Sequence, residues 1–343
     1  MPITLKTLGD LDARPFDEII DVRSPSEYAE DHVPGAINLP VLSDDERARV
    51  GTIYVQQDRF LARKVGAALV ARNAALHLET TLADRDGGYR PLVYCWRGGQ
   101  RSGSFTGILQ QIGWRADTIA GGYRSYRRLV SAALYDSPFP AQIILIDGGT
   151  GTAKTRLLGH LEHEGAQILD LEGLAAHRGS VFGSMAHPQP AQKGFESRLA
   201  DQVRRLDPAR PVFVEAESTR IGRINLPPAL AVAMKAAQAV RITAPLGARV
   251  GHLMAEYEDL DPAQIEATLG RLVRFHGHEV VAEWRDLAAR GDLAALVEAL
   301  ITQHYDPRYT RMTTRHDGPT LELADLTDAT LAATARRLIA GHG

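Results

Sequence analysis

The chain alternates short apolar runs with helical stretches, punctuated by glycine and proline. In the first part, short strands are predicted at Phe16–Val22, Leu92–Tyr94 and Thr118–Ala120. Leu61–Arg72 and Ser102–Ile112 carry apolar residues at helical spacing. Strands that alternate with helices predict a parallel sheet with helices on both of its faces.

The same alternation starts again after Asp136–Pro140, which we therefore interpret as a linker. A helix is predicted at Arg156–Glu164, and strands at Gln142–Ile146, Ala166–Leu169, Pro211–Val214 and Ala239–Ile242. Beyond Pro245 the pattern is mainly helical, over Ala263–Phe275 and Glu279–His304, and the stretch from Pro307 is left unassigned. We expect an α/β protein with two domains, residues 1–135 and 141–343, the second with a mainly helical C-terminal part.

The composition agrees with two domains and narrows the class of protein. A chain of 343 residues, 44% hydrophobic and 24% charged, is typical of an ordinary globular protein of two domains. It has no apolar signal segment at its start and no run of ~18 apolar residues, so we expect no membrane span. One free cysteine suits a reducing compartment, and we expect the cytoplasm.

Cys95 is the only cysteine of the chain and directly follows the apolar run Leu92–Tyr94. A single cysteine can form neither an internal disulfide nor a metal cluster. Two glycines allow a tight turn that brings backbone N–H groups to the sulfur. Arg97, Arg101 and a helix start near Ser102 add positive potential. These features favour a catalytic thiolate over a buried cysteine that acts as a small hydrophobe.

The stretch from Gly148 to Thr155 has the phosphate-loop spacing G-x-x-x-x-G-K-[ST], with Ala153 in place of the last glycine. Small residues let backbone N–H groups surround a phosphate, Lys154 supplies a charge, and Thr155 would ligate Mg²⁺ or donate to a phosphate oxygen. The predicted phosphate-binding residues are Gly148, Gly149, Thr150, Gly151, Thr152, Ala153, Lys154 and Thr155.

Glu215 is the candidate for an acidic group at the end of a second strand, as an acid–base group or a Mg²⁺ ligand. An aspartate is more usual at this place, and Ala153 adds a methyl group near the phosphate path. Both departures weaken the case for ordinary ATP hydrolysis. The residues alone establish neither a metal site nor the use of ATP.

RNA binding would need a local basic patch, because the net charge is −3. The candidate cluster interleaves two aromatic side chains with three arginines: Tyr123, Arg124, Tyr126, Arg127 and Arg128. Aromatic rings can stack on bases and arginines can pair with phosphates. The alternative, weighted equally, is a solvated helix face whose tyrosines pack inward. Further candidates for tRNA contact are His177, Arg178, Arg220 and Arg223.

The first domain resembles rhodanese-like sulfurtransferases in Asp21–Tyr28, in His32–Asn38 and in the Cys95 loop. Its fusion to a phosphate-loop domain is similar to the bacterial tRNA 2-selenouridine synthase family. Three more stretches strengthen this resemblance: Asp170–Ser180, Gln189–Gln192 and Glu215–Gly222. The resemblance covers nearly the whole chain and implies a rhodanese-like domain followed by a P-loop NTPase-like α/β domain.

The resemblance also implies a reaction, carried out by a cytoplasmic transferase on the wobble uridine of tRNA. Selenium from selenophosphate would replace the sulfur of 2-thiouridine, through an S-geranyl intermediate made with geranyl diphosphate. Alkylation turns the poorly leaving sulfur into a good leaving group. An enzyme that supplies selenophosphate is an expected partner. The accepted tRNAs, the C5 substituents and the oligomeric state are not implied.

Each candidate loop can be given a substrate in this reaction. Five residues separate Cys95 from Arg101, one more than in the usual single-sulfur rhodanese loop, and the wider cradle suits tetrahedral selenophosphate. We expect Cys95 to take up selenium as a perselenide while the loop and Arg101 hold the phosphate. The phosphate loop would hold the diphosphate of geranyl diphosphate, with Mg²⁺ through Thr155.

Two other functions stay open on the residues alone. One is a rhodanese-type sulfurtransferase or cysteine-based phosphatase coupled to an ATP-binding domain. The other, from a different class, is a nucleotide-dependent RNA-binding switch with Cys95 as a redox sensor.

Overall fold

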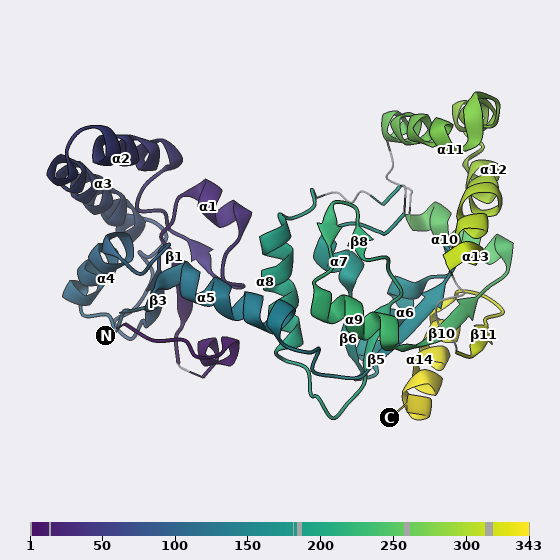
Figure 1. The fold of residues 1–343 in the computed structure, drawn as a ribbon, viewed down its shortest axis with the longest axis horizontal. Helices are drawn as coiled ribbons and strands as arrows, with labels where there is room; N and C mark the ends of the chain where they lie inside the picture. Colours follow the sequence, from purple (N-terminus) through teal and green to yellow (C-terminus); the bar gives the residue numbers. More distant parts are fainter. Residues whose placement is uncertain are drawn as a thin grey trace. The chain divides into compact units, whose positions relative to one another are not determined.

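The structure is a computed structural model, and it describes residues 2–13, 15–180, 182–183, 187–256, 261–312 and 318–342. The chain divides into two compact units (Figure 1). Unit 1 comprises Met1–Ser137 and Pro190–Arg205, and unit 2 comprises Pro138–Gln189 and Leu206–Gly343. Within the described ranges, no helix combines the length and the apolar character needed to cross a membrane.

Unit 1 is built on a parallel sheet with the strand order β2–β1–β3–β4, which confirms the predicted α/β class. Its strands are β1 (Glu18–Asp21), β2 (Ile37–Asn38), β3 (Pro91–Tyr94) and β4 (Asp117–Thr118). Its helices are η1 (Leu8–Leu11), α1 (Pro25–Glu30), α2 (Asp44–Gln56), α3 (Arg59–Glu79), α4 (Gln100–Ile112), α5 (Gly122–Ser131), the π-helical η2 (Ala132–Asp136) and α8 (Gln192–Val203).

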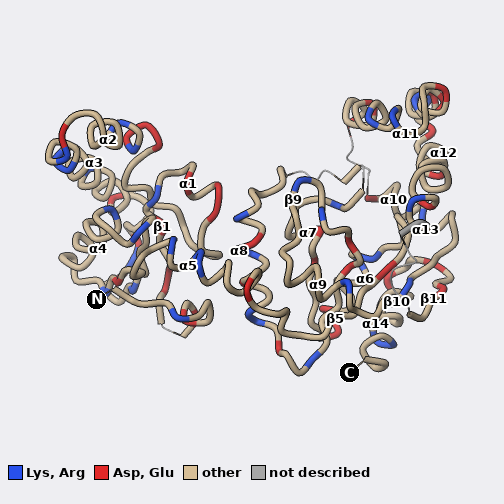
Figure 2. Tube along the Cα trace, viewed as in Figure 1, with Lys and Arg blue, Asp and Glu red and all other residues tan. Residues whose placement is uncertain are grey.

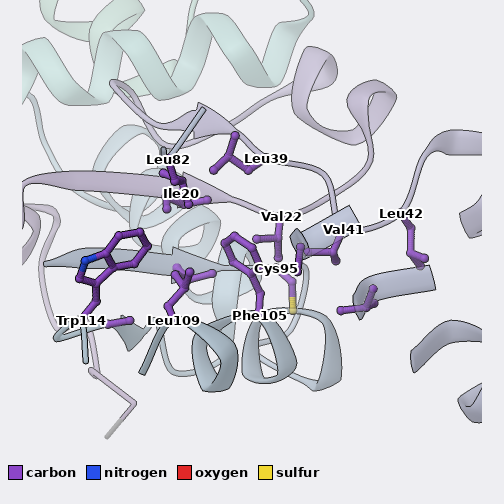
Figure 3. Close-up of a cluster of buried hydrophobic side chains, with 14 of the residues drawn as sticks. Ile20, Val22, Leu39, Val41, Leu42, Leu82, Cys95, Phe105, Leu109 and Trp114 are labelled. Carbon is purple, nitrogen blue, oxygen red and sulfur yellow. The ribbon is translucent and has the colours of Figure 1, made fainter. Parts of the chain in front are cut away.

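The core of unit 1 lies between this sheet and the helices α3 and α4. Ile20 of β1 and Val93 of β3 are fully buried there against Leu69 of α3 and Phe105 of α4. Figure 3 shows these clustered side chains, with Cys95 among them. All four residues of β3 are buried, because this central strand is covered on both faces.

Unit 2 contains a second parallel sheet, with the strand order β11–β10–β5–β7–β6. Its strands are β5 (Ile143–Gly148), β6 (Gln167–Leu169), β7 (Val212–Glu215), β10 (Gln238–Thr243) and β11 (Thr320–Glu322), with a small antiparallel hairpin of β8 (Arg220–Ile221) and β9 (Ile224–Asn225). The helices are α6 (Lys154–His163), α7 (Leu171–Ala175), α9 (Pro228–Ala236), α10 (Leu246–Glu256), α11 (Pro262–Ala289), α12 (Leu293–Ala299), the π-helical η3 (Leu300–Tyr305), α13 (Asp306–Met312) and α14 (Asp328–His342).

The two faces of this sheet are covered differently. Ile144 and Ile146 of β5 pack in one cluster with side chains of α6 and α14. Leu145, on the opposite face of β5, lines a space that is closed by α9. The stretch after Pro307 that the sequence pattern left unassigned therefore supplies an edge strand, β11, and the covering helix α14.

The helical part differs from the sequence-based expectation in its breaks. The predicted helices Ala263–Phe275 and Glu279–His304 correspond to one kinked helix, α11, followed by shorter segments. Gly277 interrupts α11 with φ 82° and ψ 174°, a backbone conformation that glycine adopts without strain.

Helix α8 packs with unit 1, although the sequence-based division placed it in the domain 141–343. The Ser197 hydroxyl donates to the buried Asp31 carboxylate at 3.0 Å. Glu196 of the same helix forms an ion pair with Arg127 and accepts a hydrogen bond from the Tyr135 hydroxyl at 2.6 Å. Such partners lie far away along the chain, so helical periodicity alone could not indicate them.

Replacing Arg23 is expected to destabilise unit 1, because its guanidinium pairs at 2.6 Å with Asp21, itself fully buried. Arg23→Met leaves that carboxylate without its counter-charge, which costs roughly 3–5 kcal/mol of unfolding free energy. The measurement is urea unfolding. Arg85→Met, which breaks a more exposed ion pair with Glu18, is the control and is expected to cost less than about 1 kcal/mol. Equal losses for both variants would contradict this account.

Candidate functional site

Cys95 follows the carboxyl end of β3, beneath the loop that leads into α4. Its side chain is only 3% exposed, and its Sγ accepts a hydrogen bond from the Ser102 hydroxyl at 3.1 Å. Among the described residues, no oxygen accepts a hydrogen bond from the N–H groups of Arg97, Gly98 or Gly99. The loop thus combines a sheltered sulfur with unused donors at the start of a helix, a combination that suits an oxyanion.

The backbone of α5 supports this loop from its other side. The N–H groups of Tyr123 and Arg124 donate to the carbonyl oxygens of Cys95 and Trp96, at 2.8 and 3.1 Å. A side chain on Gly122 would place its Cβ 2.1 Å from the Cys95 carbonyl oxygen, so only glycine allows this approach. Gly122 therefore holds the cysteine loop in place.

The two arginines of the loop have different surroundings. Arg97 is exposed, and within the described residues no acceptor contacts its guanidinium. Arg101 is instead held by an ion pair with Glu27 at 2.7 Å, and Glu27 also caps α1 through Ser24. Arg101 would have to exchange this partner to hold a phosphate, so the expected role of Arg101 needs a rearrangement and that of Arg97 does not.

The phosphate loop connects β5 to α6, as predicted. A Cβ on Gly148 would lie 2.6 Å from the Thr152 hydroxyl oxygen, so the first glycine of the motif is sterically required. The Lys154 ammonium donates to the Gly148 carbonyl oxygen at 2.8 Å, which folds its charge over the loop. Ala153 has φ 59°, the left-handed conformation that the usual glycine at this position adopts freely.

Three carboxyl groups gather beside Lys154 and Thr155. Glu172 accepts a hydrogen bond from the Thr155 hydroxyl at 3.1 Å and shares another with Glu217. Glu215 is fully buried, and it accepts the Glu172 backbone N–H at 2.6 Å. Glu215 thus positions Glu172, and Glu172 is the carboxyl group that meets Thr155. Sequence reasoning had selected only Glu215.

Burial and mutual repulsion hold protons on this cluster. Burial, followed by the charge of Glu217, raises the pKa of the Glu172 carboxyl from 4.5 to about 8. Burial and the neighbouring Glu172 carboxyl raise the pKa of Glu215 well above its usual value. Lys154 opposes the rise in the pKa of Glu217, although burial dominates. A cation or another positive group at this place would release these protons.

The donor set fits a magnesium ion held jointly with a phosphate. Across the described residues, no three side chains of His, Cys, Asp or Glu form a metal-binding group. Mg²⁺, however, commonly takes only one or two carboxylates and completes its shell with phosphate oxygens and water. The adjacent oxygens of Thr155 and Glu172 supply such a pair, and the buried Oε2 of Glu215 has no hydrogen-bond partner.

The expected stacking surface for RNA bases is not present on α5. Tyr123 and Tyr126 are 3% and 2% exposed, and the Tyr123 hydroxyl donates to the buried Asp31. Both rings pack inward, because the side of α5 that carries them is buried. This arrangement matches the second of the two alternatives, a helix whose tyrosines pack inward. Arg124 and Arg128 are exposed, whereas Arg127 is tied to Glu196.

The remaining candidates for tRNA contact lie in unit 2. Arg220 and Arg223 are exposed on the β8–β9 hairpin, and their guanidinium groups donate to nearby backbone carbonyls. His177 is half-buried with an unpartnered Nδ1, and burial together with the Arg271 charge lowers its pKa. Arg178 is its neighbour in the chain and has interactions of its own. Figure 2 shows basic and acidic residues interspersed along the trace of each unit.

Unit 1 is a rhodanese-like domain with a cysteine loop, and unit 2 is a phosphate-loop domain. A family model described as "Rhodanese-like domain" matches residues 4–129, and one described as "tRNA 2-selenouridine synthase AAA domain" matches residues 141–284. The chain belongs to the tRNA 2-selenouridine synthase family, as its similarity to curated relatives shows.

Three relatives, each named tRNA 2-selenouridine synthase, illustrate the similarity. The Marinobacter nauticus protein is 32% identical over 337 residues, covering 88% of this chain and 90% of the relative. The Aeromonas salmonicida protein is 32% identical over 322 residues, covering 85% and 86%. The Nitrosomonas europaea protein is 36% identical over 243 residues, covering 70% of this chain but 63% of its own length.

The cluster at Thr155 is expected to make stability depend on pH. A folded-state pKa of about 8, against 4.5 for a free carboxyl, means that Glu172 favours folding at low pH. This contribution is lost as the pH rises from about 4.5 through about 8. The unfolding free energy of Glu172→Gln minus that of the wild-type protein should therefore be larger at pH 8.5 than at pH 5. Urea unfolding should give a difference of at least about 1 kcal/mol.

The matched control for this experiment is Glu162→Gln, at an exposed position on α6. It should leave the pH dependence as in the wild-type protein. If Glu172→Gln showed the wild-type pH profile as well, Glu172 would not be the protonated group of the cluster.

Proposed function

We propose that this chain exchanges the sulfur of 2-thiouridine for selenium at the wobble position of tRNA, with selenophosphate as the selenium donor. One observation carries the proposal: a cysteine loop and a phosphate loop occur together in a chain that a relative named tRNA 2-selenouridine synthase matches over 88% of its length. The proposed substrate is a tRNA, and the proposed compartment is the reducing cytoplasm, as the single free cysteine suggests.

In the first proposed step, geranyl diphosphate alkylates the sulfur at C2 of the base. The sulfur attacks C1 of the geranyl group, the diphosphate leaves with the bonding electron pair, and the N3 proton of the base passes to solvent. Negative charge grows on the leaving diphosphate, where preorganised donors stabilise it best. Lys154, the loop amides and the N-terminal end of α6 are the groups suited to that task.

A magnesium ion at this site would neutralise diphosphate charge during this step. Thr155 and Glu172 would hold it, with Glu215 keeping Glu172 in place through the Glu172 N–H. The Lys154 ammonium, which rests on the Gly148 carbonyl, would turn to the diphosphate.

In the second proposed step, the selenium of selenophosphate attacks C2, and geranyl thiolate leaves with the electron pair of the C–S bond. Attack of water at phosphorus then breaks the P–Se bond and releases phosphate. The cysteine loop is the proposed site for selenophosphate, since its free N–H groups and Arg97 suit a tetrahedral oxyanion. Cys95 lies under these donors and is the group that we assign to selenium transfer. An enzyme that makes selenophosphate would supply this step.

Two variants should separate the steps. Lys154→Ala is expected to slow geranylation by about 100-fold or more, because it removes the charge that stabilises the leaving diphosphate. Cys95→Ser is expected to leave geranylation intact and to slow selenation by at least about 1000-fold. The measurement is mass spectrometry of nucleosides from 2-thiouridine tRNA, with geranylated tRNA supplied separately for the second step.

Ala153→Gly serves as the control in the phosphate loop, because glycine adopts the left-handed conformation of residue 153 without strain. It should retain both steps. Selenation that survives Cys95→Ser, or geranylation that survives Lys154→Ala, would overturn the corresponding assignment.

Arg124 and Arg128 are proposed contacts for tRNA phosphates. Each Arg→Gln change should weaken tRNA binding and lower the slope of log affinity against log salt by about 1, as for a lost phosphate contact. Fluorescence anisotropy across a salt series measures this. Arg72→Gln, whose side chain pairs with Glu46 on another face of unit 1, is the control. An unchanged slope for both variants would remove α5 from the tRNA surface.

A further inference from the structure

Unit 2 contains a cavity of about 780 Å³ on the sheet face opposite α6 and α14. Helix α9 alone lines much of its outer wall, and four of the nine residues of that helix are alanines. Its apolar lining consists of Leu145, Ala216, Leu226, Pro228, Ala231, Val232 and Met234. Small side chains on the covering helix leave space where larger ones would have closed the core.

One end of this cavity reaches the phosphate loop. Asp147, Gly148 and Glu217 line it there, so the apolar space begins at the groups proposed to hold a diphosphate. The Asp147 carboxylate is already engaged, since it accepts the Gly148 N–H at 2.8 Å and faces Arg241 at 3.7 Å. Glu217 interacts with the charge of Lys154 and shares a hydrogen bond with Glu172. Ser218, Thr219, Lys235 and Tyr309 add polar groups to the lining, and the wall along α9 is otherwise apolar.

We propose that this cavity binds the apolar chain of the diphosphate ester whose diphosphate lies in the phosphate loop; the inference rests on the proposed function. A phosphate cradle at one end and apolar side chains along the α9 wall suit an amphipathic diphosphate ester. At roughly 30 Å³ per heavy atom, a ten-carbon chain needs about 300 Å³, which the cavity provides.

A second apolar cavity, of about 370 Å³, is the alternative binding site for the ester chain. Leu253, Leu296 and Leu300 of the helical part help to line it. Leu253 also approaches Gly151 of the phosphate loop, where a Cβ would meet it at 3.0 Å. Among the described residues, no member of the phosphate loop lines this second cavity, whereas Gly148 lines the α9 cavity. The α9 cavity is therefore the assigned site.

Ala231 and Val232 should determine how long an apolar ester chain the cavity accepts. Ala231 lies on the cavity wall, and a larger side chain at this position would extend into the cavity. Val232 lines the cavity and is 69% exposed, so it lies at the rim. The end of an ester chain that extends beyond α9 would cover the Val232 side chain.

The test is calorimetric titration of the full chain with geranyl diphosphate and with inorganic diphosphate, both in Mg²⁺. Ala231→Trp should weaken geranyl diphosphate at least about tenfold, the range that one or two methylenes command in an apolar pocket. Its affinity for inorganic diphosphate should stay within about twofold, which also reports a folded phosphate loop. Val232→Asp should likewise weaken binding of geranyl diphosphate and leave binding of inorganic diphosphate unchanged. Because position 232 is exposed, this change causes no steric clash in the core.

Leu293→Trp, in the lining of the second cavity, is the matched control and should change neither affinity. The inference is overturned if both α9 variants bind geranyl diphosphate as the wild-type protein does, or if Leu293→Trp alone weakens it. A wild-type protein that binds inorganic diphosphate but does not bind geranyl diphosphate would instead refute the geranyl step itself. That result is distinct, because it appears before any variant is made.

Discussion

The parallel register of the two sheets is the constraint on which both candidate sites depend. In unit 1, Asp21 of β1 pairs with Tyr94 of β3, so the buried Asp21–Arg23 pair lies at the strand ends beside the cysteine loop. In unit 2, Ile146 of β5 pairs with Glu215 of β7, which brings the acidic end of one strand to the phosphate loop of the other. Shifting either register would separate these groups.

Each site is then completed by backbone contacts rather than by its reactive side chains. The carbonyl oxygens of Cys95 and Trp96 are held by the first turn of α5, which can come so close only because residue 122 is glycine. The Glu172 N–H is held by the buried Glu215 carboxylate, and this leaves the Glu172 side chain free to meet Thr155. In both cases a backbone contact fixes the place of the loop or side chain, and in the cysteine loop the N–H groups of Arg97, Gly98 and Gly99 remain available for an oxyanion.

The sequence predicted the α/β class, most strands of the two parallel sheets and the positions of both loops, because strand patterns and glycine-rich loops are local signals. It left the edge strand β11 unassigned. It could not show that α8 packs with unit 1, since the partners of Glu196 and Ser197 are far away in the chain. The spacing of Tyr123 and Tyr126 allowed two orientations, and burial against Asp31 and Arg23 decided between them. Glu172 and Glu217 gave a weak signal only, in the short acidic stretches that follow two predicted strands.

We propose that this chain alkylates the thiocarbonyl sulfur before selenium replaces it. A time course of nucleosides from 2-thiouridine tRNA, followed by mass spectrometry with the wild-type protein, geranyl diphosphate, Mg²⁺ and selenophosphate together, tests it most directly. The account predicts that S-geranyl-2-thiouridine rises first and decays as 2-selenouridine forms, and that no selenouridine forms without geranyl diphosphate. Selenouridine formed at the same rate in the absence of geranyl diphosphate would contradict it.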